Sequence, residues 1–342
     1  MNRPLPAPLR PLPSRSFGPT ALFARFQRWS TGREHALLSF ALARILIGCG
    51  MLLQLVPSFA DRHYLWGIGS TWVDTEATLQ GYPVVFDLLF PKTSRWAFDL
   101  CYVVLVLLAI VFVAGWKTRY VTPFLLLFWV SLQTNSMLLT NGGDTLVRMM
   151  LFFMMFARLD ARLSATALWN RARGRRAKES GTVVTTMHNT VLVICCTQIL
   201  LVYLTSSIYK LMGSEWLDGS AVYYALQIDA YRVHPFFADM AWQVTDVVRL
   251  VTWVSLAAQL VYPFLFVWRP ARYVTLAVIT VMHLSIAVLL GLWPFSLFMI
   301  ALDVLFIRDE SWSRAARAVR GFTRRIAAPF RSDGLASERD LV

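Results

Sequence analysis

The sequence predicts an all-α polytopic membrane protein, and three observations support this prediction. The chain has 342 residues, of which 57% are hydrophobic, and its mean hydropathy is +0.53. Runs of about 20 mostly apolar residues recur, and each run is long enough to cross a bilayer as a helix. The basic residues behind the net charge of +13 fall between these runs rather than along one face of a soluble domain. Membrane topology therefore explains the charge better than a nucleic-acid partner does.

About eight apolar segments are predicted to span the membrane. They cover about residues 36–57, 95–115, 118–139, 145–163, 188–211, 246–267, 272–291 and 294–307. The cysteines all lie in these segments and lack the spacing of metal ligands, so we expect buried thiols and no metal site.

The distribution of basic residues predicts the orientation. Segments that share one side after eight crossings hold 25 of the 33 lysine and arginine residues, and the opposite side holds six. Because cytoplasmic segments carry the excess of positive charge, we expect a multi-pass protein of the inner (plasma) membrane with both termini in the cytoplasm.

The chain divides into three predicted parts. Residues 1–35 form a basic, proline-rich N-terminus, in which the pattern from Phe17 to Trp29 predicts an amphipathic helix on the inner membrane surface. Residues 36–307 form the transmembrane domain, and residues 308–342 form a basic cytoplasmic tail.

Two long outer connections, residues 58–94 and 212–245, are rich in aromatic side chains and proline. Aromatic residues concentrate at the headgroup level of a membrane. We therefore expect these connections to fold as short interfacial helices that cap a cavity on the outer side.

Lys210 is the first candidate for chemistry, because it ends the fifth apolar segment. A charged side chain at this depth indicates a functional site, although a snorkelling lysine, with its stem in lipid and its head in water, explains the position equally well. Tyr203 and Ser206 precede Lys210 by seven and four residues and share its helix face, and Trp216 follows shortly after.

The fourth segment opens with Asn141, two glycines and Asp144, and it places Arg148 four residues after Asp144. Residues at this spacing share a helix face and can pair. One interpretation is a structural salt bridge between Asp144 and Arg148. The other is an anion or a polar headgroup held between Arg148 and Lys210.

His283 lies in the middle of the seventh segment. A lone histidine there is usually a satisfied core residue, but near a lysine it can orient a ligand or relay a proton. Arg44 and Asp303 lie at similar depths near the inner side. We expect them to pair with each other or to snorkel separately, without a role in chemistry.

Five motifs occur in an order that is similar to that of the HTTM (horizontally transferred transmembrane) domain family, which includes the vitamin K-dependent γ-glutamyl carboxylases. The resemblance covers about residues 36–307. The motifs are ARILIG at 43–48, DRHYLWG at 61–67, NGGD at 141–144 with Arg148, YKL at 209–211 with WLDG at 216–219, and His283 followed by Phe295-Ser296.

The resemblance implies a role for Lys210. In the carboxylases, a lysine before leucine and shortly before a Trp-x-acid-Gly pattern is the base that deprotonates vitamin K hydroquinone, and Lys210 matches that lysine. Menaquinol or vitamin K hydroquinone is then the expected cofactor. Tyr203 and His283 are expected to orient the ligand. The other residues expected at the ligand pocket are Asn141, Asp144, Arg148 and Trp216.

The chain departs from the carboxylases in two respects. It lacks their large β-rich extramembrane portion, and Gly143-Asp144 replaces a histidine that they place before the fourth segment. Bacterial members of similar length include proteins that help to mature secreted peptide toxins of the sporulation-delaying type. The expected partners are membrane lipids, with a secreted peptide or a second maturation protein at the outer face.

Three functions follow as hypotheses. The first is an enzyme acting on a quinol-type lipid cofactor or a secreted peptide, with Lys210 as general base in an apolar cavity. The second is a non-catalytic partner for peptide toxin maturation, immunity or lipid binding. It predicts that Lys210 pairs with Glu215, Asp218 or Asp144. The third is a transporter, which requires a polar path through the bundle.

Overall fold

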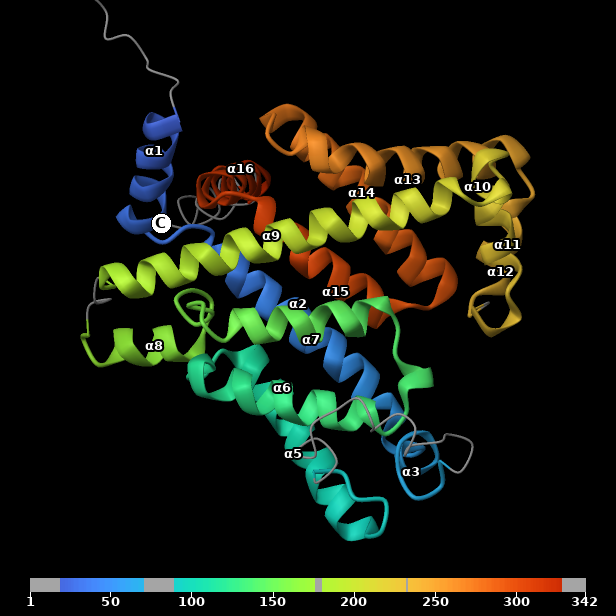
Figure 1. Ribbon diagram of the computed structural model, residues 1–342, viewed down its shortest axis with the longest axis horizontal. Coiled ribbons are helices and arrows are strands. Elements are labelled where there is room, and N and C mark those ends of the chain that lie inside the picture. The colour runs from blue at the N-terminus through green and yellow to red at the C-terminus, as the bar shows by residue number, and fades with distance from the viewer. Residues whose placement is uncertain (1–18, 71–88, 176–179, 232, 328–342) are drawn as a thin grey trace, which may run out of the picture.

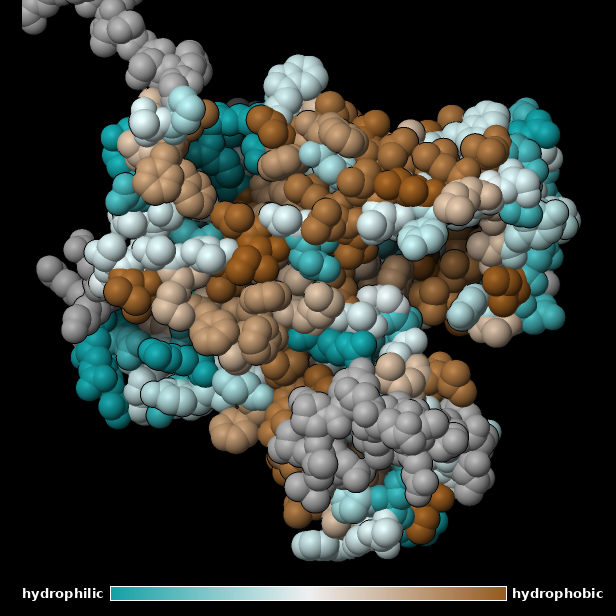
Figure 2. Space-filling view, viewed as in Figure 1, coloured by the Kyte–Doolittle hydropathy of each residue, from teal (hydrophilic) through white to brown (hydrophobic). Residues whose placement is uncertain are grey.

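The computed structural model describes residues 19–70, 89–175, 180–231 and 233–327, and these residues form helices and loops without any β-strand. The all-α prediction is confirmed. In Figure 2, apolar side chains cover the middle of the molecule, whereas hydrophilic ones gather at its two ends. This banding is typical of a protein that crosses a membrane.

A helix occurs at each of the eight predicted segments. These helices are α2 (Leu37–Leu55), α5 (Arg95–Ala114), α6 (Thr118–Thr134), α7 (Gly142–Met154), α9 (Thr182–Leu211), α13 (Thr245–Leu265), α14 (Arg269–Leu290) and α15 (Trp293–Asp303). Five of them, α2 with the turn η1 (Pro57–Phe59), α5, α9, α13 and α14, are long and apolar enough to cross a membrane, counting only the described residues. The predicted number of eight crossings stays a prediction.

The short helix α15 forms the centre of the bundle. It packs against α2, α7, α9 and α14, and Figure 1 shows it between them. Phe298, on α15, is fully buried against α2. A Cβ atom built on Gly50 of α2 would lie 2.5 Å from the Phe298 ring, so the glycine makes room for this aromatic side chain. Because so much of α15 is buried by protein, its apolar sequence reflects core packing more than contact with lipid.

The remaining long helices pack on the two sides of α2 and α15. On one side, α5 contacts α2 and α6, and α6 contacts α7. On the other side, α13 contacts both α9 and α14. Figure 1 shows α9 running the full length of the molecule beside α13.

Short helices gather at the two ends of α9. At the end called here the α10 end lie α10 (Ser214–Leu217), α11 (Ala221–Gln227), η4 (Asp229–Tyr231) and α12 (Pro235–Trp242), as Figure 1 shows. The first long connection contains α3 (Arg62–Leu65), and its residues 71–88 lie outside the described part of the chain. The prediction of short helices in these two connections agrees with the described residues. A short turn, η3 (Met137–Leu139), joins α6 to α7.

The opposite end, called here the α1 end, holds α1 (Pro19–Gly32), α8 (Ala165–Ala172) and α16 (Asp309–Ala327). Helix α1 covers the segment in which an amphipathic helix was predicted. It is joined to α9 by Asn189, whose side-chain amide donates to the carbonyls of Ser30 at 2.9 Å and of Arg33 at 2.8 Å. This contact fixes α1 to the bundle.

The segment predicted as a basic tail begins with the helix α16. The carboxylate of Asp309 accepts hydrogen bonds from the backbone N–H groups of Leu37 and Leu38, at 3.2 and 3.0 Å. These are among the first N–H groups of α2, which have no acceptor within their own helix. Asp309 therefore caps α2 and attaches α16 to the bundle. The turn η5 (Val304–Phe306) connects α15 to this segment.

The predicted arrangement of Arg44 and Asp303 is wrong in both of its forms. Arg44 is fully buried and does not snorkel. Its guanidinium donates to the carbonyls of Phe112 and Val113 at the end of α5 and to that of Leu163. The last carbonyls of a helix lack N–H donors within the helix and carry partial negative charge, so they attract the guanidinium of Arg44. Asp303 contacts Tyr203 instead.

Candidate functional site

A cavity of about 800 Å³ lies between α9, α11, α13 and α14, with residues of α15 at its base. Figure 2 shows apolar surface in the hollow beside the α10 end of α9. Most of the lining is aliphatic and includes Val202, Leu226, Leu250, Val254, Val278 and Ile286. A few polar side chains interrupt this lining: Tyr203, Ser206, Lys210, Ser255, Gln259, His283 and Ser285. A concave, mostly apolar site with few polar groups is typical of sites for small lipid-soluble ligands.

Lys210 lies in the last turn of α9 and lines this cavity. Its Nζ atom donates a 2.7 Å hydrogen bond to Oε1 of Gln259 and lies 4.6 Å from the centre of the Trp216 ring. No carboxylate among the described residues lies within ion-pairing distance of it. The pairing with Glu215, Asp218 or Asp144 that a structural role predicts is therefore not formed. The side chain is half-buried at the cavity wall.

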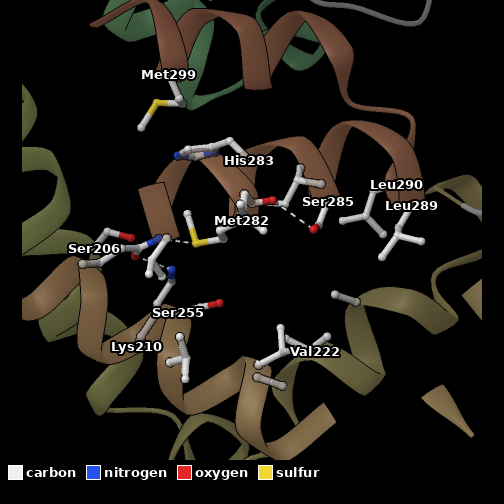
Figure 3. A pocket seen from close by; sticks show the side chains of 18 of the residues that line it. Ser206, Lys210, Val222, Ser255, Met282, His283, Ser285, Leu289, Leu290 and Met299 are labelled. Atoms are coloured by element: carbon white, nitrogen blue, oxygen red, sulfur yellow. Dashed lines mark hydrogen bonds between the residues drawn. The ribbon is translucent and has the colours of Figure 1, made fainter. Parts of the chain in front are cut away.

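Gln259, on α13, was not identified from the sequence. Its side-chain Nε2 donates to the sulfur of Met282 at 3.1 Å, which leaves Oε1 to face Lys210. Figure 3 shows Lys210 and Met282 pointing toward the same space from their two helices. The sequence feature that could have identified Gln259 is its amide side chain inside an apolar segment. Such a polar side chain usually faces the interior of a helix bundle.

Tyr203 and His283 meet at the base of the cavity. The Tyr203 hydroxyl donates to Oδ2 of Asp303 at 2.7 Å and lies 3.3 Å from Nε2 of His283. The His283 ring also packs against Phe295, with ring centres 5.7 Å apart. Thus the structure brings Lys210, Trp216, Tyr203 and His283 to one cavity. Asp303, for which no chemical role was predicted, accepts the hydrogen bond from Tyr203 but does not line the cavity.

The predicted residues of α7 lie beside the cavity rather than in its lining. Asn141 caps α7, since its Oδ1 accepts from the N–H groups of Gly143 and Asp144 at 2.7 and 3.2 Å. Asp144 completes the capping box by accepting from the N–H of Asn141 at 2.9 Å. Gly142, between them, lines the cavity.

Asp144 makes no hydrogen bond or ion pair with Arg148, so the predicted pair is not formed. The backbone of Asn141 satisfies one carboxylate oxygen of Asp144, which turns the side chain toward the helix N-terminus and away from the following turn. Arg148 is half-buried on α7 and makes its contacts elsewhere. Asn141 and Asp144 shape the cavity through the position of α7.

In the part of the chain that the structure describes, no three histidine, cysteine, aspartate or glutamate side chains are grouped as a metal site. The four cysteines are free thiols. The polar groups that remain for chemistry in the cavity are the amine, amide, hydroxyl and imidazole described above.

Comparison with known proteins places these features in a family. The profile of the HTTM domain matches residues 33–312. Over 221 residues the chain is 28% identical to the uncharacterized protein YitO of Bacillus subtilis (strain 168), covering 62% of this chain and 66% of YitO. Over 187 residues it is 24% identical to the sporulation-delaying protein SdpB of the same organism, covering 54% of each chain.

These alignments span about two thirds of YitO and about half of SdpB. No solved structure matches the chain. The family match extends over most of the transmembrane helices and includes every residue of the cavity described above. The chain therefore belongs to the HTTM domain family.

Proposed function

We propose that this chain is a membrane enzyme that admits a quinol-type lipid ligand to the cavity and uses Lys210 as a general base. One observation supports the proposal most directly. The amine of Lys210 lies at the wall of an otherwise apolar cavity and contacts a neutral amide and an indole ring, with no carboxylate at ion-pairing distance among the described residues. A lysine whose charge is not fixed by an acid remains available for proton transfer.

The cavity fits the expected cofactor, menaquinol or vitamin K hydroquinone. Its volume of about 800 Å³ and its aliphatic lining suit an aromatic headgroup with an isoprenoid tail. Such a quinol supplies a phenol-type hydroxyl, whose deprotonation makes the ring electron-rich and readily oxidised. The polar residues near Lys210 provide contacts for the headgroup, and the wall formed by α13 and α14 provides contacts for the tail.

The neighbours of Lys210 are suited to stabilise the ammonium that forms when the amine accepts a proton. Gln259 presents its carbonyl oxygen to Nζ at 2.7 Å. The Trp216 ring presents its face to the same atom, and a cation is attracted to such a ring face. Both contacts stabilise the ammonium that proton transfer forms. Unlike a carboxylate, neither of them holds the lysine permanently charged.

The remaining predicted residues have supporting roles in this proposal. Tyr203 and His283 orient the ligand at the base of the cavity. Asn141 and Asp144 fix the start of α7, where Gly142 reaches the lining. Arg148 lies one turn further along α7 and is half-buried there.

The match to the sporulation-delaying protein SdpB, together with the resemblance to family members that help to mature secreted peptide toxins, supports a place for this chemistry in such maturation. Membrane lipids and a secreted peptide or a second maturation protein would be the partners. The excess of basic residues on one side supports an inner (plasma) membrane location with cytoplasmic termini. In that orientation the α10 end faces outward.

A second candidate function is a non-catalytic maturation partner that binds a peptide at the α10 end. Large apolar side chains are exposed on the segment from α11 to α12, including Tyr224 at 56% and Phe236 at 72%. A smaller cavity of about 340 Å³ lies beside them and is lined in part by Asp218, Tyr223 and Arg249. Exposed apolar patches of this kind often mark protein contacts.

The deciding experiment compares the wild type with Lys210→Met, which keeps the length of the side chain and removes its amine. Both proteins are purified from native membranes, their bound lipids are extracted and identified, and each protein is then reconstituted with menaquinol. We expect the wild type to retain a quinone-type lipid and to oxidise menaquinol in the presence of oxygen, and Lys210→Met to lose the oxidation. Absence of quinone retention and of oxidation in the wild type would contradict the proposal.

The non-catalytic alternative makes a different prediction. Tyr224→Ala and Phe236→Ala would then abolish capture of a partner by the α10 end, while Lys210→Met would leave that capture intact. Leu107→Ala, which changes an exposed apolar residue on α5, is the matched control because α5 lies across the bundle from α11 and α12.

A further inference from the structure

Asp303 is a buried carboxylate that has no role in the proposed base chemistry. Asp303 is the last residue of α15, and it is 1% exposed. Oδ2 accepts the hydrogen bond from Tyr203, and Oδ1 has no hydrogen-bond partner among the described residues. No basic side chain among the described residues lies within ion-pairing distance of it. An ionised carboxylate inside a membrane protein is expensive without such a partner and frequently marks a proton pathway.

Tyr203 connects this carboxylate to the cavity. Its hydroxyl lies 2.7 Å from Oδ2 of Asp303 and 3.3 Å from Nε2 of His283, and the side chains of Tyr203 and His283 both line the cavity. The hydroxyl hydrogen of Tyr203 points to Asp303, so the tyrosine oxygen can only accept in its contact with His283. Nε2 of His283 must therefore carry a hydrogen and donate it to this oxygen. Nδ1 of His283 then holds a lone pair, to which no described residue donates a hydrogen bond.

The groups around Asp303 come from three of the helices near α15. The titratable or charged side chains that face it, directly or through a neighbour, are Cys196 and Tyr203 on α9, Tyr262 on α13, and Arg272 and His283 on α14. The described residues of α2 and α7, which also pack against α15, provide no hydrogen bond or ion pair to Asp303. The hydroxyl of Tyr262 is buried and, within the described part of the chain, it has no hydrogen-bond partner either. The route between Asp303 and the cavity therefore runs through Tyr203.

We propose that Asp303, Tyr203 and His283 form a proton relay that removes the proton released in the cavity, with Asp303 as the group that stores it. This inference rests on the proposed function, because the proton it moves is the one that Lys210 takes from the ligand. Ser206 lines the cavity between Tyr203 and Lys210 on the same helix face. Lys210 and Tyr203 are separated by seven residues, or about 10 Å along the helix.

The relay step conserves protons and involves no electron transfer. Nδ1 of His283 takes up one proton. The hydrogen on Nε2 passes to the tyrosine oxygen, while the hydroxyl hydrogen of Tyr203 passes to Oδ2 of Asp303. The histidine and the tyrosine end neutral, and the carboxylate has become a carboxylic acid. Asp303 is thus a positioning and storage residue that acts through Tyr203, and it does not line the cavity itself.

The test uses the full chain in vesicles of phosphatidylglycerol and phosphatidylethanolamine. Infrared difference spectra are recorded as the pH is lowered, and the carbonyl band of a protonated carboxylic acid is followed in the wild type, Asp303→Asn, Tyr203→Phe and Lys210→Met. We expect a titrating band in the wild type that Asp303→Asn lacks. Tyr203→Phe should shift this band, because the carboxyl group loses its hydrogen bond, and Lys210→Met should retain it.

Superimposable spectra of the wild type and Asp303→Asn would overturn the relay, since a carboxylate with a purely structural role does not exchange its proton. Tyr203→Phe preserves the packing of the ring and keeps the test decisive if Asp303→Asn does not fold. An unshifted band in that variant would also overturn the relay.

Turnover provides a second readout that separates the relay from the proposed function. With menaquinol as the probe, Asp303→Asn, which changes a residue outside the cavity lining, should retain the ligand and lower kcat by about a hundredfold. A loss of menaquinol retention with unchanged kcat would show a structural role and overturn the relay. If the wild type neither retains nor oxidises menaquinol, the proposed function fails, whereas the infrared band still decides whether Asp303 exchanges a proton.

Discussion

Lys210 and Gln259 stand 49 positions apart in the sequence and meet in a 2.7 Å hydrogen bond from Nζ to Oε1. The bond joins α9 to α13 at the wall of the cavity. Its acceptor is a neutral amide, so the lysine is held in place without a compensating negative charge. This distinguishes the arrangement from a structural ion pair, in which removal of either partner leaves a buried charge.

Gln259→Glu should convert this contact into an ion pair. A carboxylate at hydrogen-bonding distance favours the charged form of a lysine, which cannot accept a proton. We expect menaquinol oxidation to fall by about a hundredfold, the range that general-base catalysis typically contributes, while the thermal unfolding temperature is retained. The two measurements are the oxidation rate in vesicles and the unfolding temperature in detergent.

Gln259→Met is the matched control, because it removes the hydrogen bond without adding charge. It should lower the oxidation rate less than Gln259→Glu does. If the glutamate variant oxidises menaquinol as fast as the wild type, Lys210 is not the base.

The sequence was sufficient to predict the helices but only some of their contacts. Hydrophobic runs located every one of the eight core helices, because length and apolar content are local properties. Lys210, Tyr203 and His283 were recognisable because charged, phenolic and imidazole groups are unusual inside apolar helices. Their convergence on one cavity depends on how α9 and α14 pack, which no local pattern encodes.

The errors have a common physical cause. One of the two interpretations paired Arg44 with the carboxylate of Asp303, the other being separate snorkelling. For Asp144, one of two interpretations paired it with the guanidinium of Arg148. In the structure, Arg44 binds backbone carbonyls and Asp144 binds a backbone N–H group. The unsatisfied backbone groups at helix ends are strong competitors for charged side chains, and a sequence-based search for opposite charges overlooks them.

Arg44→Met should destabilise the fold strongly. The substitution removes the donor to the carbonyls of Val113 and Leu163, whereas the Phe112 carbonyl keeps the N–H of Gly115. Each buried acceptor left unpaired costs about 1–3 kcal/mol. We expect a free energy of unfolding that is lower by about 3 kcal/mol or more, measured by thermal unfolding followed by circular dichroism. Arg44→Lys retains the charge but lacks the forked geometry, so it should recover only part of the loss. An unchanged unfolding temperature in Arg44→Met would contradict this account.

Gly115→Ala should also be destabilising, for two separable reasons. Gly115 follows α5 with a φ of +71°, a left-handed conformation that costs a residue with a Cβ roughly 1–2 kcal/mol. In addition, the new Cβ would lie 2.4 Å from Nη1 of Arg44. Gly174 is the control, since its φ is +66° and no atom of the described residues lies within 4 Å of its Cβ position. Gly174→Ala should show only the conformational cost, and Gly115→Ala should unfold at a clearly lower temperature. Equal effects would mean that the Arg44 side chain adapts freely.

Acidification should loosen α1 through His35, which lies between α1 and α2 outside the membrane-spanning helices. The imidazole stacks on Trp29 with ring centres 4.7 Å apart, and its Nε2 lies 3.1 Å from the Trp29 carbonyl oxygen. Partial burial lowers the pKa of His35 from its ordinary value of 6.5, although the hydrogen bond with the Trp29 carbonyl opposes this shift. The folded state thus favours the neutral ring, and its contribution to stability is fully present above pH 6.5 and decreases as the pH falls below that value.

Hydrogen exchange of the α1 backbone provides the measurement, because local opening exposes these amides without unfolding the bundle. We expect exchange in residues 19–32 to accelerate as the pH falls below 6.5, after correction for the intrinsic pH dependence of exchange. His35→Phe preserves a ring that can stack on Trp29 and removes the titrating group, so its α1 exchange should not respond to acid. A similar acid response in His35→Phe would exclude His35 as its origin and would point to His188, which hydrogen-bonds the His35 carbonyl at 2.7 Å.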